Sequence, residues 1–439
     1  MAEPADNRKK SPCRREDATE VLKRLRQAGH VAYFAGGCVR DLLLGLEPKD
    51  WDIATDAQPK RVRELFSNTQ AVGAAFGVIL VREGKSVVEV ATFRSDQEYV
   101  DGRRPTGVRF TTAEEDAQRR DFTINGLFFD PLEGDRVIDF VGGVEDLRAK
   151  RLRAIGVAGE RFAEDHLRLL RAVRFAARFG LEIEPATAAA MLRDGPLLKR
   201  ISPERIGEEL RLMLATPTRG AAWEMLWQFG LLEVICRFLP MGAGVAFQRD
   251  RSVFLAVGGA DEPEESIPFG LALAAGVLCV KWQEMKGAGD IRPLLQKPAV
   301  HQMVRAMRQS LKISNEESDE IEGTLWGIAP LLAEQRPGVA TMKRFLAKPT
   351  AGLSRMLMNT LDRVGICCER IAWLRMELGE LGKTDYAPLP LIDGDDLRAA
   401  GLQPGPVFKR ILDAVYDAQL EGRLDSKEQA MRMAEEMGQ

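Results

Sequence analysis

Phe34–Asp41 reads FAGGCVRD, and Pro48–Thr55, a few residues later, reads PKDWDIAT. Two glycines turn the backbone after an apolar run, and an Arg follows near the start of a predicted helix. Alternate side chains of an extended segment share a face, so Asp50 and Asp52 are expected roughly 6.5 Å apart on one face. Such a pair suits Mg²⁺, which binds one or two carboxylates together with substrate phosphates. The pattern therefore predicts a metal-dependent centre for nucleotidyl transfer.

Length and composition limit the class of protein. The chain has 439 residues, too many for one hydrophobic core, so roughly two to four domains are expected. An apolar fraction of 45% with 29% charged residues is ordinary for a soluble globular protein. The formal net charge of -3 conceals 62 basic residues, so a nucleic-acid-binding surface would have to be local.

Cysteine and histidine content narrows the chemistry and the compartment. The six cysteines form no CxxC pair, which favours a reducing cytoplasm. None of the three histidines is followed by Asp, so a histidine-rich metal site is not expected. The basic N-terminus lacks the apolar segment of a secretory signal, and the apolar run Phe269–Val280 is too short to span a bilayer.

Strand and helix patterns divide the chain. Residues 1–15 are polar and basic and are expected to be disordered. Strand and helix patterns mix as far as about residue 155, whereas amphipathic helical spacing dominates from Arg161 to the end. The predicted strands are His30–Ala35, Trp51–Thr55, Gly77–Val81, Ser86–Arg94, Gly126–Phe129 and Val137–Asp139, and the predicted helices of this region are Glu16–Ala28, Cys38–Leu44 and Pro59–Phe66. The expected fold class is therefore α+β.

Two further elements of the mixed region carry charge. Arg119–Gly126 reads RRDFTING, and two arginines beside an Asp suit the clamping of a triphosphate, with the Asp orienting one guanidinium. Glu89 is a carboxylate within an apolar strand, Val87–Ala91. It can face the same metals as Asp50 and Asp52, or it can pair with a neighbouring Arg; both interpretations stay open.

A fourth element lies where the helical region begins, at Glu164–Phe175, which reads EDHLRLLRAVRF. On one helix, Asp165 and Arg168 would be neighbours, Arg171 would be next in the row, and Arg174 would lie nearly opposite Asp165. A carboxylate accepts from an exocyclic amine while Arg donates to the adjacent ring nitrogen. Cytosine and adenine share that edge and uracil and guanine reverse it, so this pair could select CTP and ATP without a template.

These four elements, in this order, resemble those of class II tRNA nucleotidyltransferases, which include CCA-adding enzymes and bacterial poly(A) polymerases. The resemblance covers about residues 31–240 and, more weakly, Asp393 to the end. It includes Glu98–Pro105, similar to the family's flexible loop, and Ile201–Ile206, similar to its neck motif. The resemblance implies a polymerase-β-like head with a mixed sheet (16–155), then helical neck (156–215, nucleotide selection), body (216–335) and tail (336–439, tRNA binding) domains.

The resemblance also implies a role for each matching residue. Asp50 and Asp52 would be catalytic and bind Mg²⁺; the nucleotide would be held by Gly37, Arg40, Arg120, Asp165, Arg168, Arg171 and Arg174. Within that set, Asp165 and Arg168 would read the base. The 3′-hydroxyl of the RNA would attack the α-phosphate in line and release pyrophosphate. The expected partners are ATP, CTP and the acceptor end and elbow of tRNA, in the cytoplasm, with neither DNA nor a membrane involved.

The sequence also bears on which member of the family this is. Val72–Gly77 reads VGAAFG, which is similar to the tRNA-specific branch, because the poly(A) polymerases tend to carry a basic pair there. CC-adding enzymes tend to have a shortened flexible loop, whereas Ser95–Glu115 is full length. Full CCA addition is the preferred interpretation, A addition to tRNA ending in CC is the alternative, and a poly(A) polymerase is less favoured. Gly126 departs from the family, in which Ala is common at that position.

Two interpretations from other classes fit less well. A nucleotidyltransferase for small molecules would need the head alone, and the long helical remainder argues against it. A non-catalytic RNA-binding scaffold would be favoured by the loss of either Asp50 or Asp52, and both are present.

Overall fold

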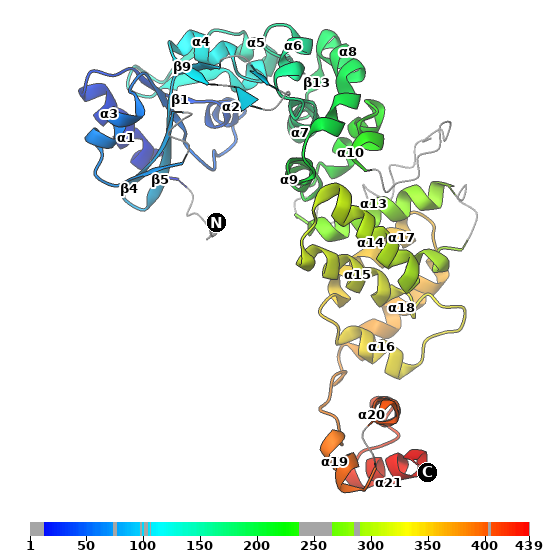
Figure 1. Cartoon of the computed structure of the whole chain (residues 1–439). Coiled ribbons are helices and arrows are strands. Elements are labelled where there is room, and N and C mark those ends of the chain that lie inside the picture. The colour runs from blue at the N-terminus through cyan, green and yellow to red at the C-terminus, as the bar shows by residue number, and fades with distance from the viewer. Residues whose placement is uncertain are drawn as a thin grey trace. The chain divides into compact units, whose positions relative to one another are not determined.

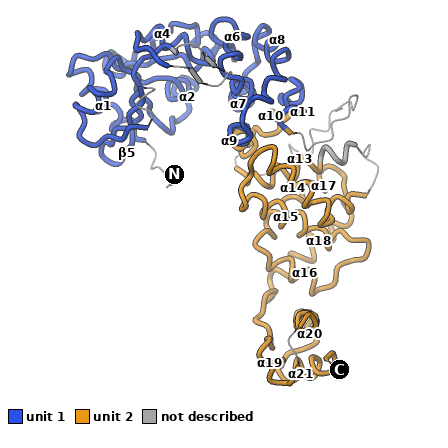
Figure 2. The backbone as a smooth tube through the Cα atoms, in the orientation of Figure 1, with its two compact units in different colours: residues 1–209, 224–235 blue, residues 210–223, 236–439 orange. Residues whose placement is uncertain are grey.

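The computed structural model describes residues 13–72, 77–96, 99–100, 104–105, 107–236, 266–284, 290–402 and 405–438. Three predictions therefore fall wholly or partly outside the described residues: the disordered N-terminus, the stretch around residues 73–76, and much of the flexible loop. The chain forms two compact units (Figure 2), the first made of Met1–Glu209 and Glu224–Ile235 and the second of Leu210–Trp223 and Cys236–Gln439.

Unit 1 is built on a seven-stranded mixed sheet (Figure 1). Its strand order is β11-β10-β1-β2-β5-β4-β3; the β2–β5 pair is parallel and the other neighbours are antiparallel. The bounds are β1 (Ala32–Ala35), β2 (Ile53–Thr55), β3 (Thr69–Ala71), β4 (Val78–Glu83), β5 (Ser86–Thr92), β10 (Leu127–Asp130) and β11 (Arg136–Asp139). This confirms the predicted α+β class and mixed sheet.

Alternation of apolar and polar residues explains the sheet. In β5, Val88 and Val90 are buried while Glu89 between them is exposed, as expected for a strand with one face on the core. Phe34 of β1 is fully buried and its ring lies 4.8 Å from that of Trp51. The sheet is flanked by the helices α1 (Arg15–Gln27), α2 (Gly37–Leu43) and α3 (Pro59–Leu65), close to the predicted spans.

The rest of unit 1 is mainly helical. Small strand pairs join β6 (Arg94–Asp96) to β9 (Val108–Phe110), β7 (Tyr99–Val100) to β8 (Arg104–Pro105), and β12 (Arg151–Leu152) to β13 (Glu182–Ile183). The helices are α4 (Ala113–Gln118), the 3₁₀ turn Thr123–Asn125, α5 (Gly143–Arg148), α6 (Ala158–Glu164), α7 (Arg168–Phe179), α8 (Pro185–Asp194), the 3₁₀ helix Gly195–Arg200 and α11 (Leu231–Ile235). Two more helices, α9 (Pro203–Leu214) and α10 (Arg219–Gln228), belong partly to unit 1 and partly to unit 2.

One local prediction is wrong: Glu164–Phe175 is not a single helix. α6 ends at Glu164 and α7 begins at Arg168, because Asp165 has an extended backbone with φ -145° and ψ 104°. Its side chain accepts a hydrogen bond from the N–H of Leu167 at 3.1 Å, a local turn that Asp favours over helix. Asp165 and Arg168 are therefore not neighbours on one helical face.

The described residues of unit 2 contain helices and no strand, which confirms the predicted helical remainder. Its helices are α13 (Phe269–Glu284), the 3₁₀ helix Arg292–Leu295, α14 (Lys297–Leu311), α15 (Asn315–Ile328), α16 (Val339–Leu346), α17 (Ala351–Arg363), α18 (Cys368–Leu381), α19 (Gly394–Ala399), α20 (Pro406–Leu420) and α21 (Lys427–Gly438). Among the helices that the structure describes, none has both the length and the hydrophobicity of a membrane-spanning segment.

Candidate active site

A cavity of about 560 Å³ in unit 1 collects most of the predicted site residues. Segments that are far apart in the sequence meet around it. They are the start of α2, the neighbouring strands β2 and β5, the RRD element (Arg119–Gly126), the turn between α6 and α7, and the start of α9. Its polar lining is Arg40, Asp52, Glu89, Thr92, Arg94, Arg119, Arg120, Asp121, Asn125, Asp165, Arg168, Arg171 and Arg205, and Gly36 and Gly37 also line it. Of the predicted residues, Asp50 and Arg174 do not line the cavity.

The glycine turn brings a cation close to the backbone. Gly36 has φ +73°, a left-handed conformation that favours glycine, and it immediately precedes α2. A Cβ at this position would lie 2.8 Å from Nη1 of Arg120. Gly36 therefore allows the Arg120 guanidinium to approach the turn, as a site for a triphosphate would require.

Two carboxylates meet where the neighbouring interior strands β2 and β5 run side by side. Ile53 of β2 pairs with Val90 of β5 in parallel register, so Asp52 and Glu89, one position earlier on each strand, lie side by side. Both line the cavity. Asp50, which precedes Trp51 in the sequence, is exposed. Trp51 itself is 5% exposed and packs in the core.

These carboxylates fit a divalent cation. The described residues contain no group of three or more His, Cys, Asp or Glu side chains arranged to hold a metal. Mg²⁺ needs only one or two protein carboxylates when substrate phosphates and water supply the other oxygens. Asp52 and Glu89, which both line the cavity, are two carboxylates of the kind that such a site requires.

Asp116 of α4 orients both arginines of the RRD element. Its Oδ1 accepts from Nε and Nη2 of Arg119 at 2.9 and 2.7 Å, and its Oδ2 accepts from Nε and Nη2 of Arg120 at 3.1 and 2.9 Å. Burial acts to raise the pKa of Asp116, but the charges of Arg120 and Arg119 outweigh it and lower the pKa. The expectation that Asp121 orients one of these arginines is wrong, because the spacing of three and four residues along the helix favours Asp116.

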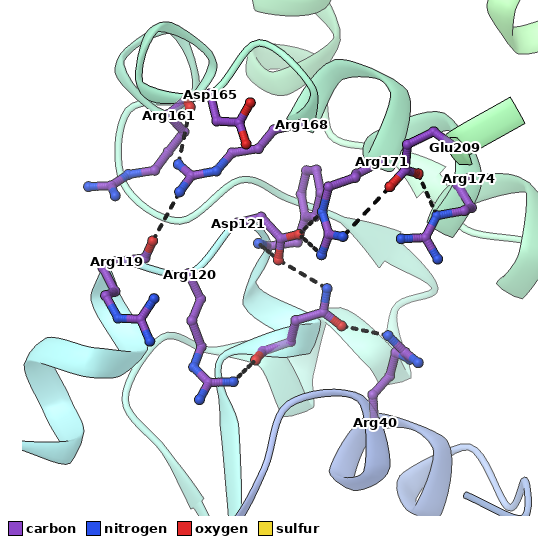
Figure 3. Close-up of polar contacts among 12 residues, drawn as sticks. Arg40, Arg119, Arg120, Asp121, Arg161, Asp165, Arg168, Arg171, Arg174 and Glu209 are labelled. Atoms are coloured by element: carbon purple, nitrogen blue, oxygen red, sulfur yellow. Dashed lines mark hydrogen bonds and ion pairs between the residues drawn. The ribbon is translucent and has the colours of Figure 1, made fainter. Parts of the chain in front are cut away.

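Asp121 instead holds Arg171 of α7. Its Oδ2 lies 2.8 Å from Nε and 2.6 Å from Nη2 of Arg171 (Figure 3). Its Oδ1 accepts from Nδ2 of Asn125 at 3.0 Å. Burial would raise the pKa of Asp121, but the Arg171 charge and the hydrogen bonds from Asn125, Arg171 and the Phe122 N–H hold it at about 2. The carboxylate is therefore ionised at neutral pH.

Arg40 continues this network into α2. Its Nη1 donates to Oδ1 of Asn125 at 2.6 Å, and its Nε and Nη2 donate to Oδ1 of Asp41 at 2.9 and 2.6 Å. The guanidinium also lies 4.3 Å from the ring centroid of Phe179. Burial lowers the pKa of Arg40. Arg40 thus lines the cavity with its guanidinium held mainly by the protein, which suits positioning.

Asp165 and Arg168 point to the cavity but hold different partners. Arg205 of α9 donates to both carboxylate oxygens of Asp165, at 3.2 and 2.8 Å. Arg168 donates through Nη1 to Oε2 of Glu164 at 2.5 Å and to the Arg161 carbonyl at 3.1 Å, and through Nη2 to the Arg119 carbonyl at 3.3 Å. Asp165 is therefore oriented by Arg205, whereas Arg168 is oriented by Glu164 and two backbone carbonyl groups.

Arg174 lies behind this layer. It donates through Nε to Oε2 of Glu209 at 2.7 Å and does not line the cavity (Figure 3). Glu209 also lies 3.9 Å from Nη1 of Arg171. Arg174 therefore supports the position of Arg171 through Glu209 in this structure.

Sequence reasoning missed several residues of the site: Asp116, Asn125, Glu164, Arg205 and Glu209. Some signals were available, because Asp116 stands one helical turn before Arg120, and Asn125 and Arg205 lie within motifs already singled out. The departure at Gly126 also has a cause. A Cβ there would meet Cγ2 of Val141 at 2.7 Å and Cδ1 of Ile155 at 3.2 Å, so the site is packed for glycine.

Comparisons with known proteins show similarity in sequence and in fold. A family model described as "Poly A polymerase head domain" matches residues 32–153, and one described as "Probable RNA and SrmB- binding site of polymerase A" matches residues 180–241. The CCA-adding enzyme of Geobacillus kaustophilus (strain HTA426) is 33% identical over 424 residues, covering 94% of this chain and 95% of that relative.

Other relatives match over different lengths. The CCA-adding enzyme of Streptococcus suis (strain 05ZYH33) is 42% identical over 238 residues, 53% of this chain, and the match spans only 57% of that relative. The crystal structure of the Bacillus stearothermophilus CCA-adding enzyme in complex with CTP superimposes with a TM-score of 0.72 at 28% identity, covering 96% of this chain and 97% of that one. The Thermotoga maritima CCA-adding enzyme complexed with tRNA_CCA shares the fold, with a TM-score of 0.62 at 19% identity over 95% and 93% of the two chains.

Proposed function

This chain belongs to the class II tRNA nucleotidyltransferase family, which includes the CCA-adding enzymes, and we propose that it adds C and A nucleotides to the 3′ end of tRNA. One observation carries the proposal: a single cavity brings the carboxylates Asp52 and Glu89 together with the base-reading pair Asp165 and Arg168. Chemistry and base choice thus meet at one place, as template-independent addition requires.

The head residues bind and orient the triphosphate. Arg120 lies against the Gly36 turn and lines the cavity, and its guanidinium is held by Asp116 through Nε and Nη2 and by the Asn125 carbonyl through Nη1. Gly37, at the start of α2, leaves room for a phosphate beside the backbone. The role of Arg40 is to keep this turn in place, through its bonds to Asp41 and Asn125.

Mg²⁺ is the proposed cation, with Asp50 and Asp52 as its ligands and Glu89 beside Asp52 on the neighbouring strand β5. When bound, it would neutralise the charge that develops on the phosphates and lower the pKa of the attacking hydroxyl. The protein's own contribution is to hold the primer hydroxyl and the α-phosphate in line, without a covalent intermediate.

Asp165 and Arg168 would choose the base. The Asp165 carboxylate accepts from the exocyclic amine of cytosine or adenine while Arg168 donates to the adjacent ring nitrogen. Uracil and guanine place a carbonyl oxygen opposite the carboxylate, which leaves two acceptors facing each other. Arg171, held by Asp121 and Glu209, would support the nucleotide from the next turn of α7, with Arg174 behind it.

The helical remainder would bind the acceptor end and elbow of tRNA. We retain the division into neck (156–215), body (216–335) and tail (336–439) as part of this proposal, together with a cytoplasmic location. A helical region of this length suits binding of a large RNA acceptor, since a small-molecule acceptor would need the head alone.

The decisive experiment offers the enzyme tRNAs that end at the discriminator base, at C, or at CC, each with one nucleotide at a time. CCA addition requires incorporation of CTP on the shortest primer and of ATP on the CC-ended primer. Incorporation of ATP alone, and only on the CC-ended primer, would identify an A-adding enzyme. A long A tail on unrelated RNA would identify a poly(A) polymerase.

A further inference from the structure

Arg205 holds Asp165 through two parallel hydrogen bonds. Nη1 donates to Oδ1 at 3.2 Å and Nη2 donates to Oδ2 at 2.8 Å. Arg205 lies in the first turn of α9, 40 residues beyond Asp165, and both side chains line the cavity. A bidentate pair between Arg and a carboxylate fixes the direction of the carboxylate as well as its distance. Asp165 therefore faces the cavity in one orientation before a base arrives.

The acceptor positions of Asp165 show what this orientation does. An ionised carboxylate offers about four acceptor positions, two on each oxygen. Oδ1 accepts from Arg205 and also from the N–H of Leu167 at 3.1 Å, so its two positions are filled. In the part of the chain that the structure describes, Oδ2 accepts from Arg205 alone, so one position remains on that oxygen.

We propose that Arg205 is a positioning residue for base selection, which directs this last acceptor position of Asp165 toward the exocyclic amine of the incoming base. The inference rests on the proposed function and deepens it. Because one position remains, an amine can bond to Asp165 from one direction only, and a carbonyl oxygen in that place meets a lone pair. Without the two-pronged contact, the carboxylate can turn about its side chain and accept from donors in other places.

Arg168 needs no help from Arg205, because other groups hold it. Both hydrogens of its Nη1 are used, by the Glu164 carboxylate and the Arg161 carbonyl, and one hydrogen of Nη2 is used by the Arg119 carbonyl. Among the residues that the structure describes, no acceptor takes the Nε–H or the second Nη2 hydrogen, so both can donate to the ring nitrogen of a base. The two base-reading residues are therefore held by different groups, and a change at position 205 acts on Asp165 rather than on Arg168.

The test compares the nucleotide selectivity of the full-length wild-type enzyme with that of the variants Arg205→Gln and Arg193→Gln. All three are assayed in the presence of Mg²⁺. Arg193 is a matched control, since its side chain is 65% exposed, pairs with Asp194 and does not line the cavity. kcat/KM is measured for CTP against UTP on tRNA lacking CCA, and for ATP against GTP on tRNA ending in CC. Thermal unfolding and tRNA affinity report any merely structural role of the Arg205–Asp165 contact.

Arg205→Gln is expected to lower the selectivity ratios about tenfold, with tRNA affinity close to that of Arg193→Gln, because the hydrogen-bonding group persists but loses its direction. In an Asp165→Ala background, Arg205→Gln is expected to lower selectivity no further, since Arg205 acts through Asp165. If the wild type is selective and Arg205→Gln is equally selective, this inference is wrong while the proposed function stands. The same conclusion follows if the losses of selectivity caused by Arg205→Gln and Asp165→Ala add fully in the double variant. A wild-type enzyme that selects among no nucleotides would overturn the proposed function as well.

Discussion

The carboxylate of Asp121 lies 2.8 Å from Nε of Arg171, although the two residues are 50 positions apart in the sequence. Asp121 belongs to the element that ends in the 3₁₀ turn Thr123–Asn125, and Arg171 belongs to α7. Asn125 connects the same carboxylate to Arg40 of α2. The elements that would hold the triphosphate and the helix that follows the base-reading turn are thus joined by one buried network.

This network makes stability depend on acid pH. The pKa of Asp121 is about 2 in the folded chain, below the ordinary value of about 3.9 for Asp in an unfolded chain. A depressed pKa contributes stability that is complete above the unfolded value and is lost as pH falls through the folded value. Asp121→Asn should therefore cost about 2 kcal/mol near neutral pH, and its difference from wild type should close between pH 4 and pH 2.

Hydrogen exchange of β10 peptides at each pH, corrected for intrinsic exchange rates, measures this free energy. Asp135→Asn is the control, because Asp135 is 66% exposed in its ion pair with Arg15. A difference between wild type and Asp121→Asn that stays constant down to pH 2 would contradict the assigned role of the ion pair.

Asp50→Ala and Asp52→Ala should each reduce nucleotide incorporation at least about a thousandfold, because each removes a proposed ligand for the cation that stabilises the phosphates. Binding of tRNA should persist, since both residues belong to the head, whereas the helical remainder is proposed to bind the tRNA. Single-turnover incorporation and filter binding give the two readouts. Glu47→Ala, an exposed carboxylate nearby, should leave both unchanged. Retained incorporation by either Asp variant would refute the proposed metal ligands.

Arg168→Ala should relax base choice more than it weakens RNA binding. Loss of a donor to the ring nitrogen should lower the preference for CTP over UTP about tenfold or more, while tRNA affinity stays within about threefold. Competition between labelled nucleotides on one primer measures the preference. Arg178→Ala, on the same helix but exposed and outside the cavity lining, provides the comparison. If selection among the four nucleotides were unchanged in Arg168→Ala, the base-reading role would be wrong.

Gly36→Ala should weaken triphosphate binding. A Cβ there would lie 2.8 Å from Nη1 of Arg120 and would displace that guanidinium, so KM for CTP or ATP should rise about tenfold. Gly45→Ala is the control, because Gly45 also has a positive φ, +71°, but its Cβ would meet nothing within 4 Å. Both variants should lose about 1–2 kcal/mol of stability through the left-handed backbone. Equal KM values in the two variants would show that the approach of Arg120 does not matter for binding.

Much of the fold could be predicted because the signals are local. The alternation in Ser86–Thr92 marks a strand, and the apolar spacing of Arg15–Gln27 marks a helix, in both cases through side chains a few residues apart. The glycine turn and the change to helices after Arg161 are local signals of the same kind. The prediction of one helix over Glu164–Phe175 is wrong, because the Asp165 side chain accepts a hydrogen bond from the Leu167 N–H and interrupts the helix.

The amino-acid order alone predicts the types of element, the mixed sheet followed by helices, and the residues able to make metal, phosphate and base contacts. The partners of those residues come from the packing of distant segments: Arg205 for Asp165, Arg171 for Asp121, and Glu89 beside Asp52. Backbone conformation follows neighbours within a few residues, whereas a charged side chain pairs with whatever the packing of distant elements brings within about 3 Å.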